Sequence, residues 1–292
     1  MRKTFSFIVL VCVFSNILFS QQTNTKDPII FALVFDGTWL DPIAFVKKGK
    51  LVHIESSVAM KDTREILVSK YYKMQTPYNL IFGGGKNGTV IVEDNHWGDC
   101  SGYSAIVKVK SKVKPDQASP ALASNLKIPK TQNNFRRELT FSEKKIVEKL
   151  VKAEFKKHRI ENKKLNSINL NAIDFNNDKV PEFVGSFYVI TGKKSRGLLF
   201  FIAEKTKGGS YSFSFKSFEM IVEKDVMSGN IKDLDEGIYH EILLDAFDFN
   251  NDGQKEIFTV GYAFEGNNYF VYRKVAGKWK KVFDTYSYRC GY

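Results

Sequence analysis

The chain has 292 residues, of which 43% are hydrophobic and 14% aromatic, and it carries 44 Lys and Arg against 32 Asp and Glu. This composition excludes intrinsic disorder, because such a chain can bury enough apolar surface to offset its ordering entropy. Only 20 Gly and 7 Pro exclude a collagen-like chain, and three cysteines exclude a disulfide-dense mini-protein. The length predicts about two domains.

Residues 1–20 have the pattern of a secretory signal peptide. Arg2 and Lys3 form a short basic start, a nearly unbroken apolar run follows, and the first carboxylate is Asp27. We expect cleavage after Ser20. An uncleaved anchor is the alternative, but the run is shorter than the about 20 residues that a span needs. The sequence therefore predicts a secreted or periplasmic protein with no transmembrane span after signal cleavage.

The net charge is +12, and +10 remains without the two basic residues of the signal. An excess of positive charge attracts polyanions. For an exported protein these are anionic envelope polymers, so we expect such polymers or another exported protein as the partner, and no nucleic acid. The alternative is that the charge mainly sets solubility.

Two cysteines, Cys100 and Cys290, remain outside the signal. In an oxidising compartment they can form a disulfide that ties the N-terminal half to the last three residues. Two free buried thiols are the alternative, because the distance between the cysteines cannot be read from the sequence.

Residues 23–114 are expected to form an N-terminal β-rich domain with one helix. Met60–Tyr72 has helical spacing, whereas the remaining apolar runs are separated by turn signals, as in strands. The glycine-rich loop 83–88 lacks the spacing of a phosphate-binding loop, and its Asn87-Gly88 pair predicts a hairpin turn. The expected strands are 28–35, 43–46, 51–54, 78–82, 89–92 and 103–113.

Residues 115–135 contain three prolines with several Ser and Asn, and they are predicted to form a linker. A long surface loop is the alternative. The clearest helix follows, where Thr140 and Glu143 make a capping box. Its expected apolar stripe consists of Ile146, Val147, Leu150, Val151 and Phe155.

The opposite face of this helix is basic, because 136–164 contain eleven Lys and Arg but only five Glu. Either the helix lies on a sheet with a solvated basic face, or it binds a membrane surface or a nucleic-acid groove. The first interpretation is favoured, since the apolar stripe is narrow.

Residues 136–292 are expected to form a second domain, a helix followed by β-strands. Short β patterns separated by Gly, Asn and Asp clusters predict a sandwich-like or propeller-blade-like arrangement. The fold class is therefore α+β and β-rich, with short antiparallel strands and a long amphipathic helix near the middle. The expected strands are 168–173, 182–190, 198–203, 211–222, 238–247, 256–262, 269–273 and 279–286.

One motif occurs twice in this part of the chain. Residues 172–182 read AIDFNNDKVPE and residues 246–256 read AFDFNNDGQKE, and the copies start 74 residues apart. Each copy follows one apolar strand and precedes another. The repeat indicates internal duplication of a strand–loop–strand unit.

Oxygen-bearing side chains occupy positions one, three, five and nine of each loop, and the main-chain carbonyl at position seven adds another oxygen. Ca²⁺ takes about six to eight such ligands. An EF-hand is excluded, because Gly185 and Thr259 stand where its bidentate Glu is required. Turn capping by the Asp side chains is the alternative. The candidate metal ligands are Asp174, Asn176, Asp178 and Glu182 in the first loop, and Asp248, Asn250, Asp252 and Glu256 in the second.

These loops resemble the calcium loops of FG-GAP and VCBS-type repeats, which occur in integrin-α-like propellers and in many exported bacterial proteins. The pattern there is Asp-x-Asp/Asn-x-Asp-Gly-x-x-Asp/Glu. The second loop matches it throughout, whereas the first has Lys179 in place of the Gly. The resemblance implies a calcium-stabilised β module rather than a reaction. Because Gly253 reaches the left-handed backbone region at little cost, we expect the second loop to bind Ca²⁺ more tightly.

The sequence thus predicts an exported calcium-stabilised binding or structural module without catalytic activity. The alternative is a secreted hydrolase of cell-envelope polymers that uses the loop Asp94–Asp99, where carboxylates and His96 provide acid–base groups. No Gly-x-Ser-x-Gly or His-Glu-x-x-His motif occurs, so no catalytic or cofactor-binding residue is assigned.

Overall fold

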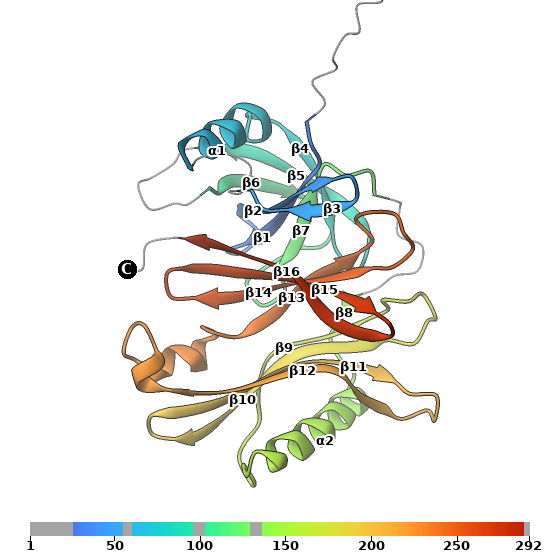
Figure 1. Cartoon of the computed structure of the whole chain (residues 1–292), viewed down its shortest axis with the longest axis vertical. Coiled ribbons are helices and arrows are strands. Elements are labelled where there is room, and N and C mark those ends of the chain that lie inside the picture. Colours follow the sequence, from blue (N-terminus) through green and yellow to red (C-terminus); the bar gives the residue numbers. More distant parts are fainter. Residues whose placement is uncertain (1–25, 55–59, 96–102, 129–135, 289–292) are drawn as a thin grey trace, which may run out of the picture.

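The computed structural model describes residues 26–54, 60–95, 103–128 and 136–288, and its β layers are stacked on one another (Figure 1). A barrel from the N-terminal half lies at one end, a four-stranded sheet lies in the middle, and a five-stranded sheet with a helix on its outer face lies at the other end. The strand pairings of the described residues are all antiparallel. The predicted β-rich, antiparallel character is confirmed.

Six strands close the barrel: β1 (Ile29–Val34), β2 (Trp39–Lys47), β4 (Pro77–Ile81), β5 (Lys86–Asp94), β6 (Ala105–Lys110) and β7 (Ala121–Ser124). Their order is β1-β7-β4-β5-β6-β2, β2 pairs back to β1, and β3 (Lys50–Val52) extends the sheet beside β2. Phe31 and Leu33 of β1 belong to the barrel core, whereas Ile30 and Ala32 pack against the middle sheet. Burial on both faces explains why β1 is an unbroken apolar run.

The predicted helical segment 60–72 packs into the barrel core. It consists of α1 (Met60–Ile66) and the π-helical turn η2 (Leu67–Tyr71). The Tyr71 hydroxyl donates to the main-chain oxygen of Asp27 at 2.9 Å, and the Tyr78 hydroxyl donates to that of Tyr71 at 2.5 Å. These buried phenols therefore keep hydrogen-bond partners inside an apolar core.

The segment 115–135, predicted as a linker, contributes a barrel strand. The four residues of β7 are all buried and pair with β1 on one side and β4 on the other. The strand was missed because its sequence, ALAS, contains no β-branched or aromatic residue and is preceded by the turn signals Ser119 and Pro120. Because β7 is part of the barrel, the linker prediction is wrong for 121–124. Residues 129–135 lie outside the described part of the chain.

The C-terminal half contains two consecutive four-stranded meanders. The eight strands predicted there are all present, which confirms that part of the prediction. The first meander is β9 (Asn166–Ile173), β10 (Glu182–Gly192), β11 (Ser195–Lys205) and β12 (Tyr211–Val222), and β8 (Arg136–Arg137) adds a fifth strand beside β9. The second is β13 (Glu241–Phe247), β14 (Glu256–Ala263), β15 (Gly266–Val275) and β16 (Lys278–Tyr288).

The two meanders pack face to face. Val184 and Ile202 of the first share a core with Leu243, Ile257 and Tyr272 of the second. Short 3₁₀ turns, η3 (Glu223–Asp225) and η4 (Ile231–Glu236), lie in the connection between the meanders. The described residues form a stack of sheets, and no ring of blades, as in a propeller, is seen among them.

The predicted helix is α2 (Phe141–Lys157), 17 residues long. Glu143 N donates to Thr140 Oγ1 at 3.4 Å, and Thr140 N donates to the Glu143 carboxylate at 2.7 Å, so the capping box is confirmed. Only three of the five expected stripe positions are buried, namely Val147, Val151 and Phe155. The prediction of a long amphipathic helix is therefore wrong. The helix α2 is 17 residues long, and only a narrow apolar face of it packs on the five-stranded sheet. Among the described helices, none combines the length and apolarity that a membrane crossing needs.

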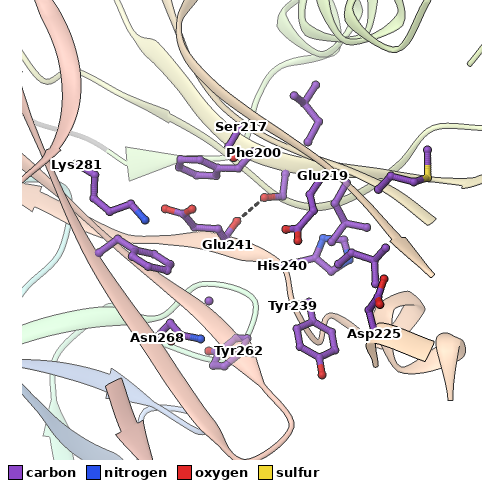
Figure 2. A pocket seen from close by; sticks show the side chains of 17 residues that line it. Phe200, Ser217, Glu219, Asp225, Tyr239, His240, Glu241, Tyr262, Asn268 and Lys281 are labelled. Carbon is purple, nitrogen blue, oxygen red and sulfur yellow. Dashed lines mark hydrogen bonds between the residues drawn. The ribbon is translucent and has the colours of Figure 1, made fainter. Parts of the chain in front are cut away.

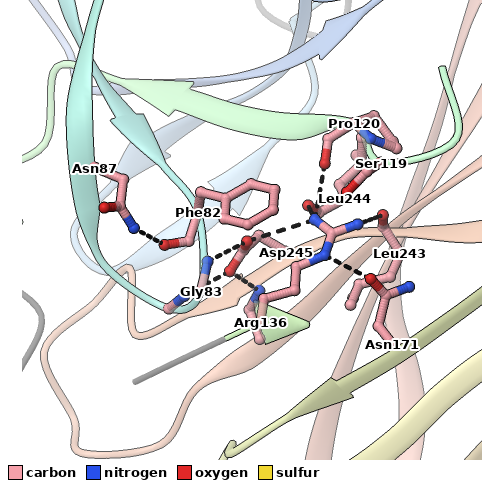
Figure 3. A network of polar contacts seen from close by, with 12 residues as sticks. Phe82, Gly83, Asn87, Ser119, Pro120, Arg136, Asn171, Leu243, Leu244 and Asp245 are labelled. Atoms are coloured by element: carbon pink, nitrogen blue, oxygen red, sulfur yellow. Dashed lines mark hydrogen bonds and ion pairs between the residues drawn. The ribbon is translucent and has the colours of Figure 1, made fainter. Parts of the chain in front are cut away.

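The stacked layers meet at a buried ion pair between Arg136 of β8 and Asp245 of β13 (Figure 3). Arg136 Nη1 lies 3.6 Å from Asp245 Oδ2, and the side chains are 1% and 0% exposed. The guanidinium also donates to main-chain oxygens of Pro120, Leu243 and Leu244. One arginine thereby links the barrel segment to both sheets.

The glycine-rich loop completes this junction. Gly83 N and Gly84 N each donate to Asp245 at 2.7 Å, so the loop cradles a carboxylate of the protein itself (Figure 3). Both glycines have positive φ, 68° and 83°, in the turn that Phe82 N closes by donating to Gly85 O at 3.0 Å. The predicted turn at Asn87-Gly88 is wrong, because these residues lie within β5.

Candidate functional site

The two acidic loops lie against each other. The first connects β9 to β10, and the second connects β13 to β14. Lys255 of the second loop donates from Nζ to the main-chain oxygen of Asp174 at 3.2 Å and to Asn177 Oδ1 at 3.0 Å in the first. The fold therefore brings both sets of predicted ligands, 74 residues apart in sequence, into one region.

Both loops have the same backbone turn. At position four, φ is 63° for Asn177 and 59° for Asn251, and at position six it is 68° for Lys179 and 88° for Gly253. The prediction that position six uses the left-handed region is confirmed. Lys179 carries strain there on the order of 1 kcal/mol, which a glycine avoids.

The side chains at positions one, three and five cap their own loops. At position one, Asp174 and Asp248 accept from the amide five residues later, at 3.0 and 2.8 Å. At position five, Asp178 and Asp252 accept from the amide two residues later, at 2.7 and 3.0 Å. The asparagine at position three accepts from the amide at position five, at 2.9 and 3.1 Å. A carboxylate offers about four acceptor sites, so this capping does not exhaust it.

Position nine places a carboxylate in the interior of each sheet. Glu182 is 4% exposed and Glu256 is 0% exposed. Burial raises the pKa of Glu182 to about 7, although Phe175 N donates to its Oε2 at 2.7 Å. Burial, together with the charge of Asp248, raises the pKa of Glu256 to about 8. Both carboxylates thus lack full electrostatic compensation in the folded chain.

Several buried oxygens of these loops have unused acceptor capacity. Asp174 Oδ1 and both carboxylate oxygens of Glu256 meet no donor at hydrogen-bond geometry among the described residues. The backbone amides of Phe249 and Glu256 still favour the ionised form of Glu256, but burial outweighs them. Arg273 Nε lies 3.4 Å from Glu256 Oε1. Hard anionic oxygens of this kind suit Ca²⁺, so the donor set fits that ion. Within the described residues, however, no three or more Asp, Glu, His or Cys side chains stand close enough to hold a metal as they are.

A cavity of about 420 Å³ lies between the two meanders (Figure 2). Thr259 Oγ1 donates to Glu241 Oε1 at 2.5 Å, and burial raises the pKa of Glu241 to about 7 against the opposing charge of Lys281. Lys281 Nζ lies 4.2 Å from the ring centroid of Phe270, close enough for a cation–π contact. The cavity thus contains a carboxyl group that titrates near neutral pH.

His240 also lines this cavity (Figure 2). Its Nε2 lies 2.8 Å from the main-chain oxygen of Leu234, which can only accept, so we assign the ring proton to Nε2. Burial lowers the pKa of His240 to about 4, and its buried Nδ1 has no hydrogen-bond partner among the described residues. The cavity wall therefore combines a neutral imidazole, a carboxyl and an ammonium group.

Sequence reasoning did not find this cavity. Its lining comes from seven strands, the η3 turn and the segment that leads into β13, and no short motif predicts that these elements converge. The loop Asp94–Asp99 of the alternative hydrolase is described only at Asp94 and Asn95, and its remaining residues lie outside the described part. The signal 1–20, Cys100 and Cys290 lie outside it as well.

Comparison with protein-family models, with curated proteins and with solved structures finds no match to this chain. The resemblance to FG-GAP and VCBS-type loops therefore stays a hypothesis that depends on the residues of the two loops.

Proposed function

We propose that this chain is an exported, calcium-stabilised binding or structural module without catalytic activity. The observation that carries the proposal is the pair of buried carboxylates, Glu182 and Glu256, at position nine of two loops with one backbone turn. An ionised buried carboxylate without full compensation costs stability, and a divalent cation beside it reverses that cost.

The residues that would hold calcium are those expected from the spacing. Asp174, Asn176, Asp178 and Glu182 would serve the first loop, and Asp248, Asn250, Asp252 and Glu256 the second. The carboxylates at positions one and five accept hydrogen bonds from loop amides. A cation would therefore bind through the acceptor sites of these carboxylates that the amides leave unused. A cation would neutralise the carboxylates and fix the turn between two strands of each sheet.

The partner and the location belong to the same proposal. The basic excess favours an anionic envelope polymer or another exported protein over nucleic acid, in the periplasm or outside the cell. The exposed lysines of α2, on the face that points away from the sheet, add to this excess.

Thermal unfolding of the purified protein in CaCl₂ and in EGTA tests the proposal. A ligand that binds only the folded state at a hundredfold excess over Kd stabilises it by about 2.7 kcal/mol. For a chain of this size that raises the Tm by roughly 5–10 °C. The double variant Asp174→Ala/Asp248→Ala should lose the response, and MgCl₂ at equal concentration is the control for ionic strength. A wild-type Tm indifferent to both Ca²⁺ and EGTA would refute the calcium proposal.

A secreted hydrolase is the second candidate, and Glu241 is the observation that favours it. A carboxyl group with a pKa of about 7 in a cavity can act as a general acid near neutral pH. Release of reducing ends or free amines from purified envelope polymers would test this function. Activity that Glu241→Gln abolishes would favour the enzyme over the non-catalytic module.

A further inference from the structure

The two acidic loops differ in the residue that lies beside position nine on the next strand. Phe183 pairs with Ala203, which places Glu204 of β11 next to Glu182. Ile257 pairs with Tyr272, which places Arg273 of β15 next to Glu256. The duplicated loops therefore have an acidic neighbour in one sheet and a basic neighbour in the other.

Arg273 contacts two predicted ligands of the second loop at once. Its Nη2 forms an ion pair with Asp252 Oδ2 at position five, and its Nε lies 3.4 Å from Glu256 Oε1 at position nine. The guanidinium therefore already pairs with two carboxylates that a metal ion in this loop would bind. A cation entering the second loop has to displace Arg273 or bind beside a positive charge.

The first loop has no such ion pair to its ligands among the described residues. Lys255 reaches it, and its positive charge interacts with the charges of Asp174 and Glu182, but its Nζ donates to the Asp174 carbonyl and the Asn177 amide oxygen and forms no ion pair with a ligand carboxylate among the described residues. Asp174 is 3% exposed, and no donor within the described parts of the chain bonds to its Oδ1. Lys274 Nζ donates to both carboxylate oxygens of Glu204 at 2.9 Å. Glu204 is therefore a paired carboxylate near the loop, and we do not count it as a metal ligand.

The glycine at position six does not rank the loops. Lys179 already has φ 68° in the folded chain, so its strain is a cost of folding and not of binding. Affinity then depends on the charges that a cation meets.

We infer that the first loop, Asp174–Glu182, is the stronger divalent-cation site, and that Arg273 is a built-in counter-cation of the second loop, Asp248–Glu256. This inference rests on the proposed calcium function and reverses the order expected from Gly253. It makes Arg273 the residue that determines whether the second loop takes a metal ion.

Isothermal titration of the purified protein with CaCl₂ tests the inference. The wild type should bind one ion tightly, Asp174→Ala should lose that site, and Asp248→Ala should keep it within about threefold. Arg273→Gln should tighten the second site by about tenfold or more, because the positive guanidinium no longer competes with the cation for Asp252 and Glu256. Lys280→Gln is the matched control: it removes one positive charge directly across from Arg273 on β16, and should change neither site by more than about threefold.

Arg273→Lys covers the case in which Arg273→Gln fails to fold. It keeps the charge but loses the planar fork that spans two carboxylates, so a smaller tightening is expected. Loss of the tight site in Asp248→Ala but not in Asp174→Ala would overturn the inference, and so would equal titrations of the wild type and both Arg273 variants. Either result leaves calcium binding intact, whereas a wild type that binds no Ca²⁺ refutes the proposed function itself.

Discussion

Replacing Asp245 by Asn tests whether the buried ion pair holds the stacked layers together. The two side chains have nearly the same shape, so the substitution removes a charge without opening a cavity. Gly83 N and Gly84 N donate to different oxygens of Asp245, each at 2.7 Å. An Asn side chain presents one oxygen and one NH₂ group. One glycine amide would therefore face a second donor.

The substitution also leaves Arg136 without its counter-charge. Its side chain is 1% exposed, and its other partners are main-chain carbonyls and the amide oxygen of Asn171. Removing one member of a buried ion pair costs about 3–5 kcal/mol, and an unsatisfied buried donor costs about 1–3 kcal/mol. Both penalties arise from one carboxylate, so we expect a loss of about 4 kcal/mol rather than their sum.

Urea unfolding followed by tryptophan fluorescence measures this loss. Asp245→Asn should lower the free energy of unfolding by about 4 kcal/mol at an unchanged m-value. Arg136→Met should cost a similar amount, and the double variant should cost clearly less than the two single losses together. Asp284→Asn, on the exposed face of β16, is the control and should stay within about 0.5 kcal/mol. A loss below about 1 kcal/mol in Asp245→Asn would contradict the reasoning.

Three further predictions concern other parts of the chain. The pKa of Glu241 is about 7 in the folded state against an ordinary 4.5, so the folded state binds the proton more tightly and stability falls as pH rises through this window. Glu241→Gln should remove up to about 3 kcal/mol of that fall between pH 5 and 8 in urea titrations, whereas Glu219→Gln on the facing strand should not. Thr140→Ala should cost about 1 kcal/mol through loss of the α2 cap, and Thr140→Ser should restore most of it. Non-reducing peptide mapping should find Cys100 linked to Cys290, and full labelling of both thiols in the unfolded, unreduced protein would end that prediction.

Local patterns predicted the strands of the C-terminal half because apolar and aromatic residues run along them and Gly, Asn and Asp clusters separate them. The capping box at Thr140 could also be predicted from the sequence, since it depends on two residues only three positions apart. β7 was missed for the opposite reason. ALAS has weak β propensity by itself, and its burial comes from β1 and β4, which lie some 40 to 90 residues earlier in the chain.

The ranking of the two loops shows a second limit of sequence reasoning. Gly253 and Lys179 sit inside the motif, so their effect on the backbone could be predicted, and the left-handed turn is present in both loops. Arg273 lies 17 residues beyond Glu256, and it meets the loop only through the register of β14 with β15. A register of this kind depends on hairpin geometry rather than on the residues of the loop.

The position of the loops favours a stabilising role for a bound cation over a catalytic one. Lys255 of the second loop contacts the first loop, and its half-buried ammonium group interacts with the charge of Asp174 there and with that of Asp245 at the layer junction. The proposed cation sites, the contact between the loops through Lys255 and the buried ion pair therefore interact electrostatically. The cavity that contains Glu241 lies between the same two sheets, so a cation that fixes both loops would also limit how far those sheets can separate. On this reasoning, calcium would act on any ligand of the cavity through the spacing of the sheets, and not by direct contact with it.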